Sequence, residues 1–229
     1  MSEVTSYEIE NYKNIRVGYL PHLDGGGRGF GQEFIRVVRE KIGKVNHIFE
    51  FCAGPGFIGF SLMAHGLCNK LTLADVNPEA VRTCQHTIDS NNLGDKVSVY
   101  LSDCLDSIPE TEQWDLVVSN PPHFFTPSQE IYKADIRRYD PNFLIHKKYY
   151  KDISRFLKPD GISLIQENSR ATSYKDFTPM IEESGLEIVE VFHARVMSLG
   201  ECRRERGRIG FDNKISPFYF IWSQKVRND

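Results

Sequence analysis

One stretch decides the fold of this chain: Glu50-Phe51-Cys52-Ala53-Gly54-Pro55-Gly56-Phe57-Ile58-Gly59, which follows a short apolar run and opens a helical pattern. Its glycines permit a tight turn and let a ligand approach the backbone, and the start of the helix offers free N–H groups. The spacing Gly-x-Gly-x-x-Gly also fits a dinucleotide-binding turn, or a packing turn that binds nothing. The stretch alone predicts a strand, a turn and a helix, and leaves the ligand open.

Short apolar runs alternate with helical patterns around this turn, which is typical of a parallel sheet covered on both faces. Strands are expected at 47–52, 71–76, 97–101, 114–119 and 162–166, and helices at about 57–66, 78–91, 142–157 and 173–184. Residues 158–161, Lys-Pro-Asp-Gly, are expected to form a stop and a turn. Two further runs, 186–191 and 217–222, lack a long helix between them and predict an antiparallel pair at the sheet edge.

These elements together predict an α/β fold with a seven-stranded, mostly parallel, doubly wound sheet whose last strand is antiparallel. Residues 46–229 are expected to form this domain, and residues 1–45 an N-terminal extension. The extension contains a possible hairpin (7–20), a glycine-rich segment (24–31) and a helix near 30–42. The glycine-rich segment lacks the Gly-Lys-Ser/Thr of a Walker phosphate loop, so a lid over the ligand and a flexible linker both stay open.

Composition narrows the class of protein. The chain has 229 residues and a net charge of −3, whereas proteins that bind duplex DNA through many phosphates usually have a clear basic excess. DNA is therefore an unexpected partner, while a local patch that contacts RNA stays open. The five cysteines are odd in number and form no Cys-x-x-Cys pair, so neither a disulfide framework nor a metal site is expected. With no membrane-spanning run and no secretory signal in the sequence, we expect a cytoplasmic protein.

Acidic residues follow the next two strands. Asp75 ends the second strand, where a carboxylate can accept hydrogen bonds from ribose hydroxyls. Asp103 ends the third strand, where it can accept a hydrogen bond from an adenine amino group. Each could instead be a capping residue or an exposed acid. Because ligands of open α/β sheets bind at the carboxyl edge, three ligand-type strand ends in a row favour a nucleoside-containing ligand.

The fourth strand is followed by Ser119-Asn120-Pro121-Pro122-His123. This motif resembles the Asn-Pro-Pro-aromatic signature of class I S-adenosylmethionine (SAM)-dependent amino-methyltransferases. Members of that family act on exocyclic amines of adenine or guanine in DNA or RNA, and on glutamine amides in release factors and ribosomal proteins. The resemblance covers roughly residues 45–170 and implies a Rossmann-like methyltransferase fold that binds SAM.

The resemblance also implies roles for the four motif residues. In the family, the side-chain oxygen of the Asn and the backbone carbonyl of the first Pro hold the N–H hydrogens of the acceptor, here Asn120 and Pro121. Holding them turns a delocalised nitrogen toward the methyl group. Pro122 stiffens the loop, and His123 stacks on the planar acceptor. His123 stands where the family usually has Tyr, Phe or Trp, so it could also hydrogen-bond the substrate or take its proton.

Cofactor and substrate residues follow from the same resemblance. Glu50 corresponds to the family's acid near the amino group of SAM, and Cys52 replaces a common glycine as a packing residue. The predicted cofactor-binding residues are Glu50, Cys52, Ala53, Gly54, Gly56, Gly59, Asp75, Val76, Asp103, Cys104 and Asn120. The long aromatic and basic loop after His123 is expected to shape the substrate pocket, or else to be a solvated surface. The predicted substrate-binding residues are Arg28, Phe30, His123, Phe124, Arg137 and Arg138.

The sequence therefore predicts a SAM-dependent N-methyltransferase that acts on a planar amine or amide nitrogen of a protein side chain or a small metabolite. Three alternatives stay open: an RNA base N-methyltransferase, a nicotinamide-dependent oxidoreductase and a non-catalytic SAM-binding partner subunit. The oxidoreductase would share the glycine turn and Asp75, but nothing in its chemistry requires Asn-Pro-Pro-His after the fourth strand. The arginine-rich stretch 202–208 is expected to be a solvated hairpin tip, with RNA contact as its alternative.

Overall fold

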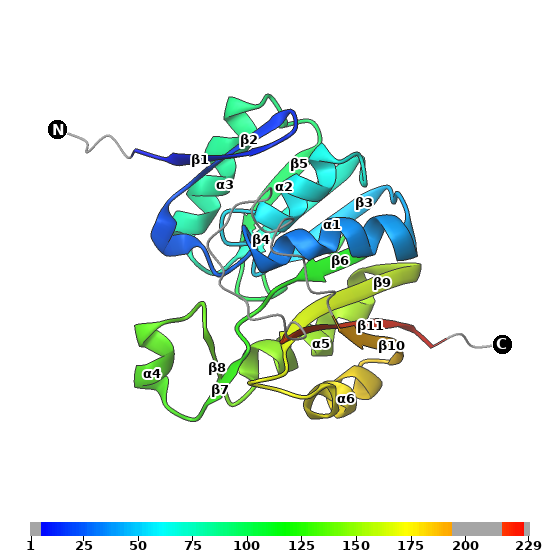
Figure 1. The fold of residues 1–229 in the computed structure, drawn as a ribbon. Coiled ribbons are helices and arrows are strands. Elements are labelled where there is room, and N and C mark those ends of the chain that lie inside the picture. The colour runs from blue at the N-terminus through cyan, green and yellow to red at the C-terminus, as the bar shows by residue number, and fades with distance from the viewer. Residues whose placement is uncertain (1–5, 194–216, 227–229) are drawn as a thin grey trace.

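The computed structural model describes residues 6–193 and 217–226, so the arginine-rich stretch 202–208 lies outside the described residues. Its centre is a seven-stranded sheet of order β10-β11-β9-β6-β3-β4-β5 (Figure 1). The strands are β3 (His47–Phe51), β4 (Lys70–Asp75), β5 (Val97–Leu101), β6 (Trp114–Ser119), β9 (Leu157–Asn168), β10 (Leu186–His193) and β11 (Phe218–Lys225). β3, β4, β5, β6 and β9 are parallel, and β11 is antiparallel to both β9 and β10. This confirms the predicted sheet with its antiparallel last strand.

Helices cover both faces of the sheet (Figure 1). One face packs against α1 (Glu33–Val37), its π-helical continuation η3 (Val38–Ile42), α2 (Phe57–Ala64) and α3 (Pro78–Ser90), and the other against α5 (Leu144–Phe156) and α6 (Tyr174–Glu183). Successive strand residues point to opposite faces, so Ile48 joins the first core and Phe49 the second. Burial on both faces explains why the strands are nearly continuous apolar runs.

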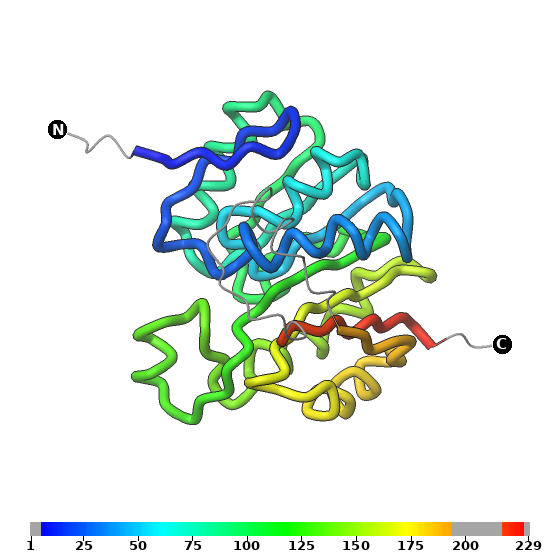
Figure 2. Tube along the Cα trace, in the orientation of Figure 1, coloured from blue at the N-terminus to red at the C-terminus, as the bar shows by residue number. Residues whose placement is uncertain are grey.

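The N-terminal extension is bonded to the helices of the first face. A hairpin of β1 (Glu8–Tyr12) and β2 (Ile15–Tyr19) packs beside α3, where the N–H of Gly18 donates to the Thr87 hydroxyl at 3.0 Å (Figure 2). Two short 3-10 turns, η1 (Pro21–Leu23) and η2 (Phe30–Gln32), lead from the hairpin into α1. The hairpin predicted at 7–20 is thus confirmed, and the helix predicted near 30–42 is present as a 3-10, α and π succession.

The segment after His123 is more ordered than the predicted loop. It contains α4 (Gln129–Ala134), capped by the Ser128 side chain, and two short parallel strands, β7 (Phe124–Thr126) and β8 (Tyr139–Pro141). Strands of three residues are too short to show an alternating pattern, which is why the sequence did not reveal them. We call this segment, residues 124–141, the excursion. Its α4 end projects from the carboxyl edge of the sheet, whereas β8 lies beside α5 (Figure 1).

The turn predicted at 158–161 lies inside β9 instead of before it. Trp114 of β6 pairs with Leu157, whereas Leu116 pairs with Ile162, so residues 158–161 bulge out between two paired positions. A Cβ on Gly161 would lie 2.9 Å from the nitrogen of Lys158, which shows how tight the bulge is. The helix does end at Phe156, so the stop was predicted correctly and only the strand boundary was wrong.

Within the described residues, no helix is long and apolar enough to cross a membrane. The longest helices, α3 and α5, have 13 residues each, well short of the roughly 20 that a bilayer requires.

Stability is expected to depend on pH through Glu33 at the start of α1. Burial raises the pKa of this side chain to about 8, so the folded chain keeps its proton to a higher pH than the unfolded chain. Stability therefore falls as pH rises from about 4.5 towards 8. Glu33→Gln copies the neutral form. In urea unfolding we expect wild type and variant to match near about pH 4, and the variant to be more stable by about 1–3 kcal/mol near about pH 8.5. Parallel pH profiles would contradict this.

Candidate active site

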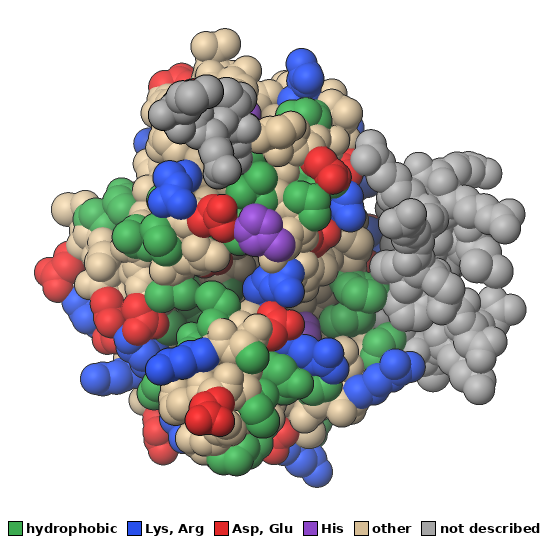
Figure 3. All heavy atoms as spheres, turned by 90° about the vertical axis from the view of Figure 1, so that its left-hand side faces the viewer, with side chains coloured by type: hydrophobic (Ala, Val, Ile, Leu, Met, Phe, Trp, Pro, Cys, Tyr) green, Lys and Arg blue, Asp and Glu red, His purple; other side chains and the backbone are tan. Residues whose placement is uncertain are grey.

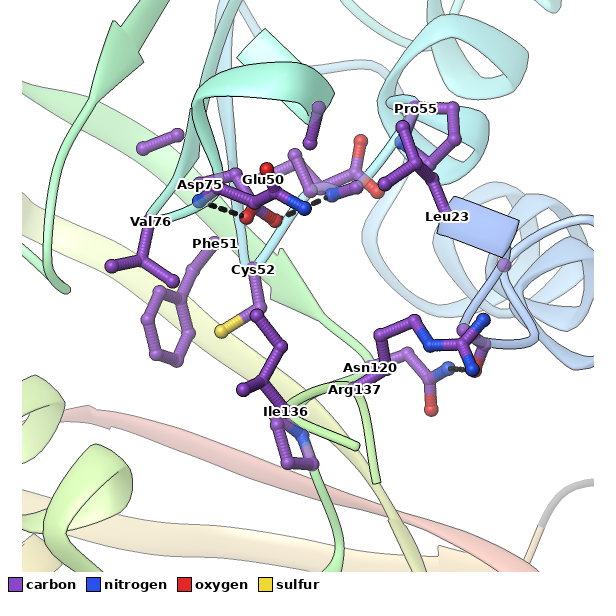
Figure 4. A pocket seen from close by; sticks show the side chains of 18 of the residues that line it. Leu23, Glu50, Phe51, Cys52, Pro55, Asp75, Val76, Asn120, Ile136 and Arg137 are labelled. Atoms are coloured by element: carbon purple, nitrogen blue, oxygen red, sulfur yellow. Dashed lines mark hydrogen bonds between the residues drawn. The ribbon is translucent and has the colours of Figure 1, made fainter. Parts of the chain in front are cut away.

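A cleft opens at the carboxyl edge of the sheet, where β3, β4, β5 and β6 end (Figure 4). Two segments outside the sheet also line the cleft. The glycine-rich side contributes Leu23, Gly25 and Gly27, and the excursion contributes Ile136 and Arg137. The predicted cofactor residues that line it are Glu50, Cys52, Ala53, Gly54, Asp75, Val76, Asp103, Cys104 and Asn120. The sequence did not single out Leu23, Pro55, Tyr132, Ile136 or Ile145, which also line it and are apolar or aromatic.

Two of the predicted cofactor glycines, Gly56 and Gly59, do not line the cleft. Gly56 has φ of 78°, and a Cβ there would lie 2.8 Å from the Phe60 ring. A Cβ on Gly59 would lie 2.7 Å from the Leu71 side chain. These glycines therefore let α2 pack closely on the sheet, and Gly54 is the member of the motif that faces the cleft.

The Glu50 side chain links the end of β3 to the start of α2. Its side chain is buried and accepts the N–H of Gly59 at 2.7 Å and the N–H of Ile58 at 3.3 Å. Burial raises the pKa of Glu50 to about 8, although these two N–H groups act in the opposite direction. The carboxyl group thus completes the helix N-terminus and also lines the cleft, where a bound cation would favour its ionised form.

Asp75 at the end of β4 has a similar double role. One carboxylate oxygen accepts the N–H of Gly54 at 2.8 Å, and the other accepts the N–H of Asn77 at 2.8 Å (Figure 4). Burial raises its pKa, and the backbone N–H groups partly oppose this. Each oxygen keeps a second lone pair, so Asp75 can still accept hydrogen bonds from two ligand hydroxyls. Asp103 is more exposed and pairs with Lys148 at 2.6 Å.

Asn120 has one side-chain atom bonded and one without a partner. Its amide nitrogen donates to the carbonyl of Gly25 at 3.3 Å (Figure 4). Its Oδ1 is buried and has no hydrogen-bond partner among the described residues. A buried acceptor without a donor costs about 1–3 kcal/mol, and this one belongs to a residue that lines the cleft. Pro122 lines the same cleft, whereas Pro121 is buried and is not among its lining residues.

A second cavity adjoins the cleft, because Gly25 and Arg137 line both. All the predicted substrate residues except Arg28 meet here: Phe30, His123, Phe124, Arg137 and Arg138. Its other lining residues are Asp24, Gly25, Asp135, Asn168 and Phe218. The guanidinium of Arg138 lies 4.7 Å from the centre of the Phe124 ring. Figure 3 shows the face with α4 and the hairpin, which is hollowed between side chains of both charges and apolar ones.

The glycine-rich segment lies against both cavities. Besides the bond from Asn120 to Gly25, the Arg137 guanidinium donates to the carbonyl of His22, which ties this side to the excursion. Arg28 lines neither cavity: its guanidinium bonds Asp24 at 3.1 Å and the Tyr19 hydroxyl. The segment therefore borders both cavities, while the side chain of Arg28 is directed at the hairpin.

Three buried titratable side chains that the sequence did not reveal, Glu167, His146 and Asp140, form a hydrogen-bonded chain behind His123. His123 Nδ1 is 3.1 Å from Glu167 Oε2, Glu167 Oε1 is 2.8 Å from His146 Nε2, and His146 Nδ1 is 2.6 Å from Asp140 Oδ2. Glu167 lies at the end of β9, His146 in the first turn of α5 and Asp140 in β8. Only one signal could have found it: Glu167 is an acid that directly follows the strand expected at 162–166.

The charges of these hydrogen-bonded side chains stabilise one another. Burial alone would lower the pKa of His146, but the Glu167 and Asp140 carboxylates outweigh it and raise the pKa to about 9. Burial alone would raise the pKa of Glu167, but the His146 cation and the hydrogen bonds from both histidines lower it to about 2. At neutral pH His146 is therefore a histidinium that lies between two carboxylates.

The chain is similar to known methyltransferases. Residues 30–136 match the family model of the methyltransferase small domain. A release factor glutamine methyltransferase of Clostridium acetobutylicum is 25% identical over 153 residues, 62% of this chain and 53% of the relative, so the chain spans about half the length of that protein. A ribosomal RNA small subunit methyltransferase C of Actinobacillus pleuropneumoniae is 37% identical over 100 residues, 44% of this chain and 28% of the relative.

Among solved structures, a ribosomal protein L11 methylase of Lactobacillus delbrueckii subsp. bulgaricus superposes with a TM-score of 0.52. The match covers 85% of this chain and 77% of the methylase chain, at 11% sequence identity. The fold is that of Rossmann-like methyltransferases. The comparisons thus support the predicted SAM-dependent methyltransferase domain.

The role of the glycine turn can be tested by stability. We expect Gly56→Ala to lower the free energy of unfolding by about 1–3 kcal/mol, because an alanine at positive φ is strained and its Cβ meets Phe60. The matched control is Gly94→Ala, where a Cβ meets nothing within 4 Å, and its change should stay within about 0.5 kcal/mol. Urea unfolding of both variants measures the difference, and equal midpoints would contradict the assigned turn.

Proposed function

We propose that this chain is a SAM-dependent N-methyltransferase that transfers a methyl group to a planar amine or amide nitrogen of a protein side chain or a small metabolite. The observation that supports this most directly is Asn120 Oδ1, a buried acceptor that has no partner in the described part of the chain and belongs to a residue lining the cleft. The methyltransferase relatives and the fold agree with the proposal.

The residues around the cleft suit SAM. Asp75 would accept the ribose hydroxyls, Asp103 the adenine amino group, and Glu50 would face the amino group of the methionine part. When bound, SAM supplies a methyl group on a positively charged sulfur, which is already a good leaving group. The raised pKa of Glu50, about 8, belongs to the free protein, and a neighbouring ammonium group would lower it.

The chain's contribution to the reaction would be placement. Asn120 Oδ1 would accept one N–H hydrogen of the acceptor, so that the nitrogen keeps a preferred direction of approach. The resemblance gives the second hydrogen to the Pro121 carbonyl, although Pro121 lines neither cavity in this structure. Because the amide nitrogen of Asn120 is bonded to Gly25, the side chain is held with its oxygen available. The two prolines fix their own φ angles and limit the freedom of the loop.

The second cavity is the proposed substrate site. Its aromatic residues, Phe30, Phe124 and Phe218, can enclose a planar group, and Arg138 can pair with an anionic part of the acceptor. A protein amide is the leading acceptor because the Clostridium acetobutylicum relative is named for glutamine methylation of a release factor. Such acceptors would place the reaction in the cytoplasm. An RNA base remains the alternative, since the Actinobacillus pleuropneumoniae relative is named for ribosomal RNA.

The proposal predicts separate effects on binding and on transfer. In a thermal-shift assay SAM should stabilise the wild type and NAD should not. Asn120→Ala should still bind SAM but transfer labelled methyl about 100-fold more slowly, because the acceptor loses its orienting oxygen. The control is Asn69→Ala, whose exposed amide bonds Asn46, and it should transfer at the wild-type rate.

The acceptor is tested by offering labelled SAM with a release factor, with ribosomal RNA and with a pool of small metabolites. Label in the protein or metabolite fraction supports the proposal, and label only in RNA favours the RNA alternative. Stabilisation by NAD in place of SAM would indicate an oxidoreductase. SAM binding with no transfer to any of these pools would indicate a non-catalytic subunit.

A further inference from the structure

The hydrogen-bonded row behind His123 is held in place at Asp140, its far end. Among the described residues, solvent reaches it at His123. Asp140 accepts the N–H of Ile145 at 2.9 Å, and the His146 ring stacks on Phe177 at 4.4 Å, so both are held by packed elements. The side chains of Asp140 and Glu167 are fully buried, and that of His146 is 2% exposed. His123 is 11% exposed and lines the second cavity. The chain therefore reaches a ligand through His123 alone.

The hydrogen bonds define which nitrogen of His123 bears the proton. Glu167 is ionised and can only accept, and its Oε2 faces both His123 Nδ1 and the Thr172 hydroxyl, at 3.1 and 3.2 Å. Nδ1 must therefore bear a hydrogen. In the neutral ring the lone pair is then on Nε2, to which no described residue is bonded. This is the form of histidine that can take a proton at Nε2.

The side chains behind His123 carry a net negative charge. Two carboxylates and one histidinium give Asp140, His146 and Glu167 a net charge of −1, and Glu167 touches the His123 ring directly. The other charged side chains that line the cavity, Asp24, Asp135, Arg137 and Arg138, include two of each sign. Glu167 Oε2 thus lies against Nδ1, on the side of the ring away from Nε2, at 3.1 Å.

We propose that Glu167, backed by His146 and Asp140, is a positioning residue that holds His123 with Nε2 toward the acceptor, and that Nε2 takes the proton released on methylation. This rests on the proposed function. The acceptor nitrogen forms a bond to the methyl carbon, and the carbon–sulfur bond breaks with its electron pair left on sulfur. The N–H proton passes to Nε2, and its bonding pair stays on nitrogen.

The proposal implies more than a stacking role for the fourth residue of the motif. Tyr, Phe or Trp at this position can stack, but none offers a basic nitrogen backed by a carboxylate. The acceptor must be a nitrogen that still bears a hydrogen to give up, as a primary amide or an aryl amine does. His123→Phe, which keeps a flat ring and removes both nitrogens, separates the two roles.

The first test is the tautomer of His123, read without any ligand by ¹⁵N NMR of the imidazole nitrogens. We expect hydrogen on Nδ1 in the wild type. In Glu167→Gln the amide oxygen would face the His146 donor, so the amide N–H would face Nδ1 and move the hydrogen of His123 to Nε2. The matched control is Glu33→Gln, another buried Glu-to-Gln change, which should leave the wild-type tautomer. Hydrogen on Nε2 in the wild type would overturn the proposal.

The second test is turnover with labelled SAM and a release factor as acceptor. His123→Phe and Glu167→Gln should each lower kcat about 100-fold, with SAM affinity unchanged within about twofold, while Glu33→Gln stays near wild type. Wild-type kcat in His123→Phe would overturn the proton-acceptor role. If Glu167→Gln does not fold, the wild-type tautomer and His123→Phe still decide.

Failure of the proposed function has a different signature from failure of this inference. A wild type that binds no SAM would refute the proposed function, and the proton transfer with it, whatever the tautomer of His123. A wild type that binds SAM and transfers methyl, but shows hydrogen on Nε2 of His123 or tolerates His123→Phe, would refute the inference and leave the proposed function intact.

Discussion

Parallel strands that share a sheet must end at the same edge, and most of this structure depends on that constraint. The residues that follow β3, β4, β5 and β6 come from distant parts of the chain, yet they line one cleft. β9 runs in the same direction, so its final acid, Glu167, reaches the same edge and supports the residue that follows β6. The antiparallel β11 then places Phe218 beside this edge, where it lines the second cavity.

Polar groups at this edge are buried at a cost, and each one offsets that cost by holding another element in place. Glu50 completes the start of α2, Asp75 holds the glycine turn through Gly54, and Asp140 bonds the N–H groups at the start of α5. The same carboxylates lie in or directly behind the two cavities. Structural and ligand-binding roles thus fall on the same atoms, because a buried carboxylate needs several donors and a cleft lined by N–H groups provides them.

The excursion between β6 and α5 joins the two cavities into one site. It starts at the Asn-Pro-Pro-His motif, contributes Arg137 to both cavities and returns through Asp140 to the buried chain. The glycine-rich segment meets it from the other side through Gly25 and His22. The cleft at the sheet edge therefore adjoins a second cavity that is lined largely by two segments outside the main sheet.

The sequence by itself determined the sheet, the positions of its helices and nine residues of the cleft. It could do so because a strand buried on both faces is a local run of apolar residues. In addition, the residues that directly follow parallel strands all lie at the carboxyl edge of the sheet, where ligands bind. The short strands β7 and β8, the bulge at 158–161 and the chain from Asp140 to His123 came only from the tertiary structure. Hydrogen bonds between residues that are 44 or 21 positions apart, as Glu167 makes with the two histidines, leave no periodic signal in the chain. Their partners are chosen by where packed elements meet, and that is decided only when the whole domain has folded.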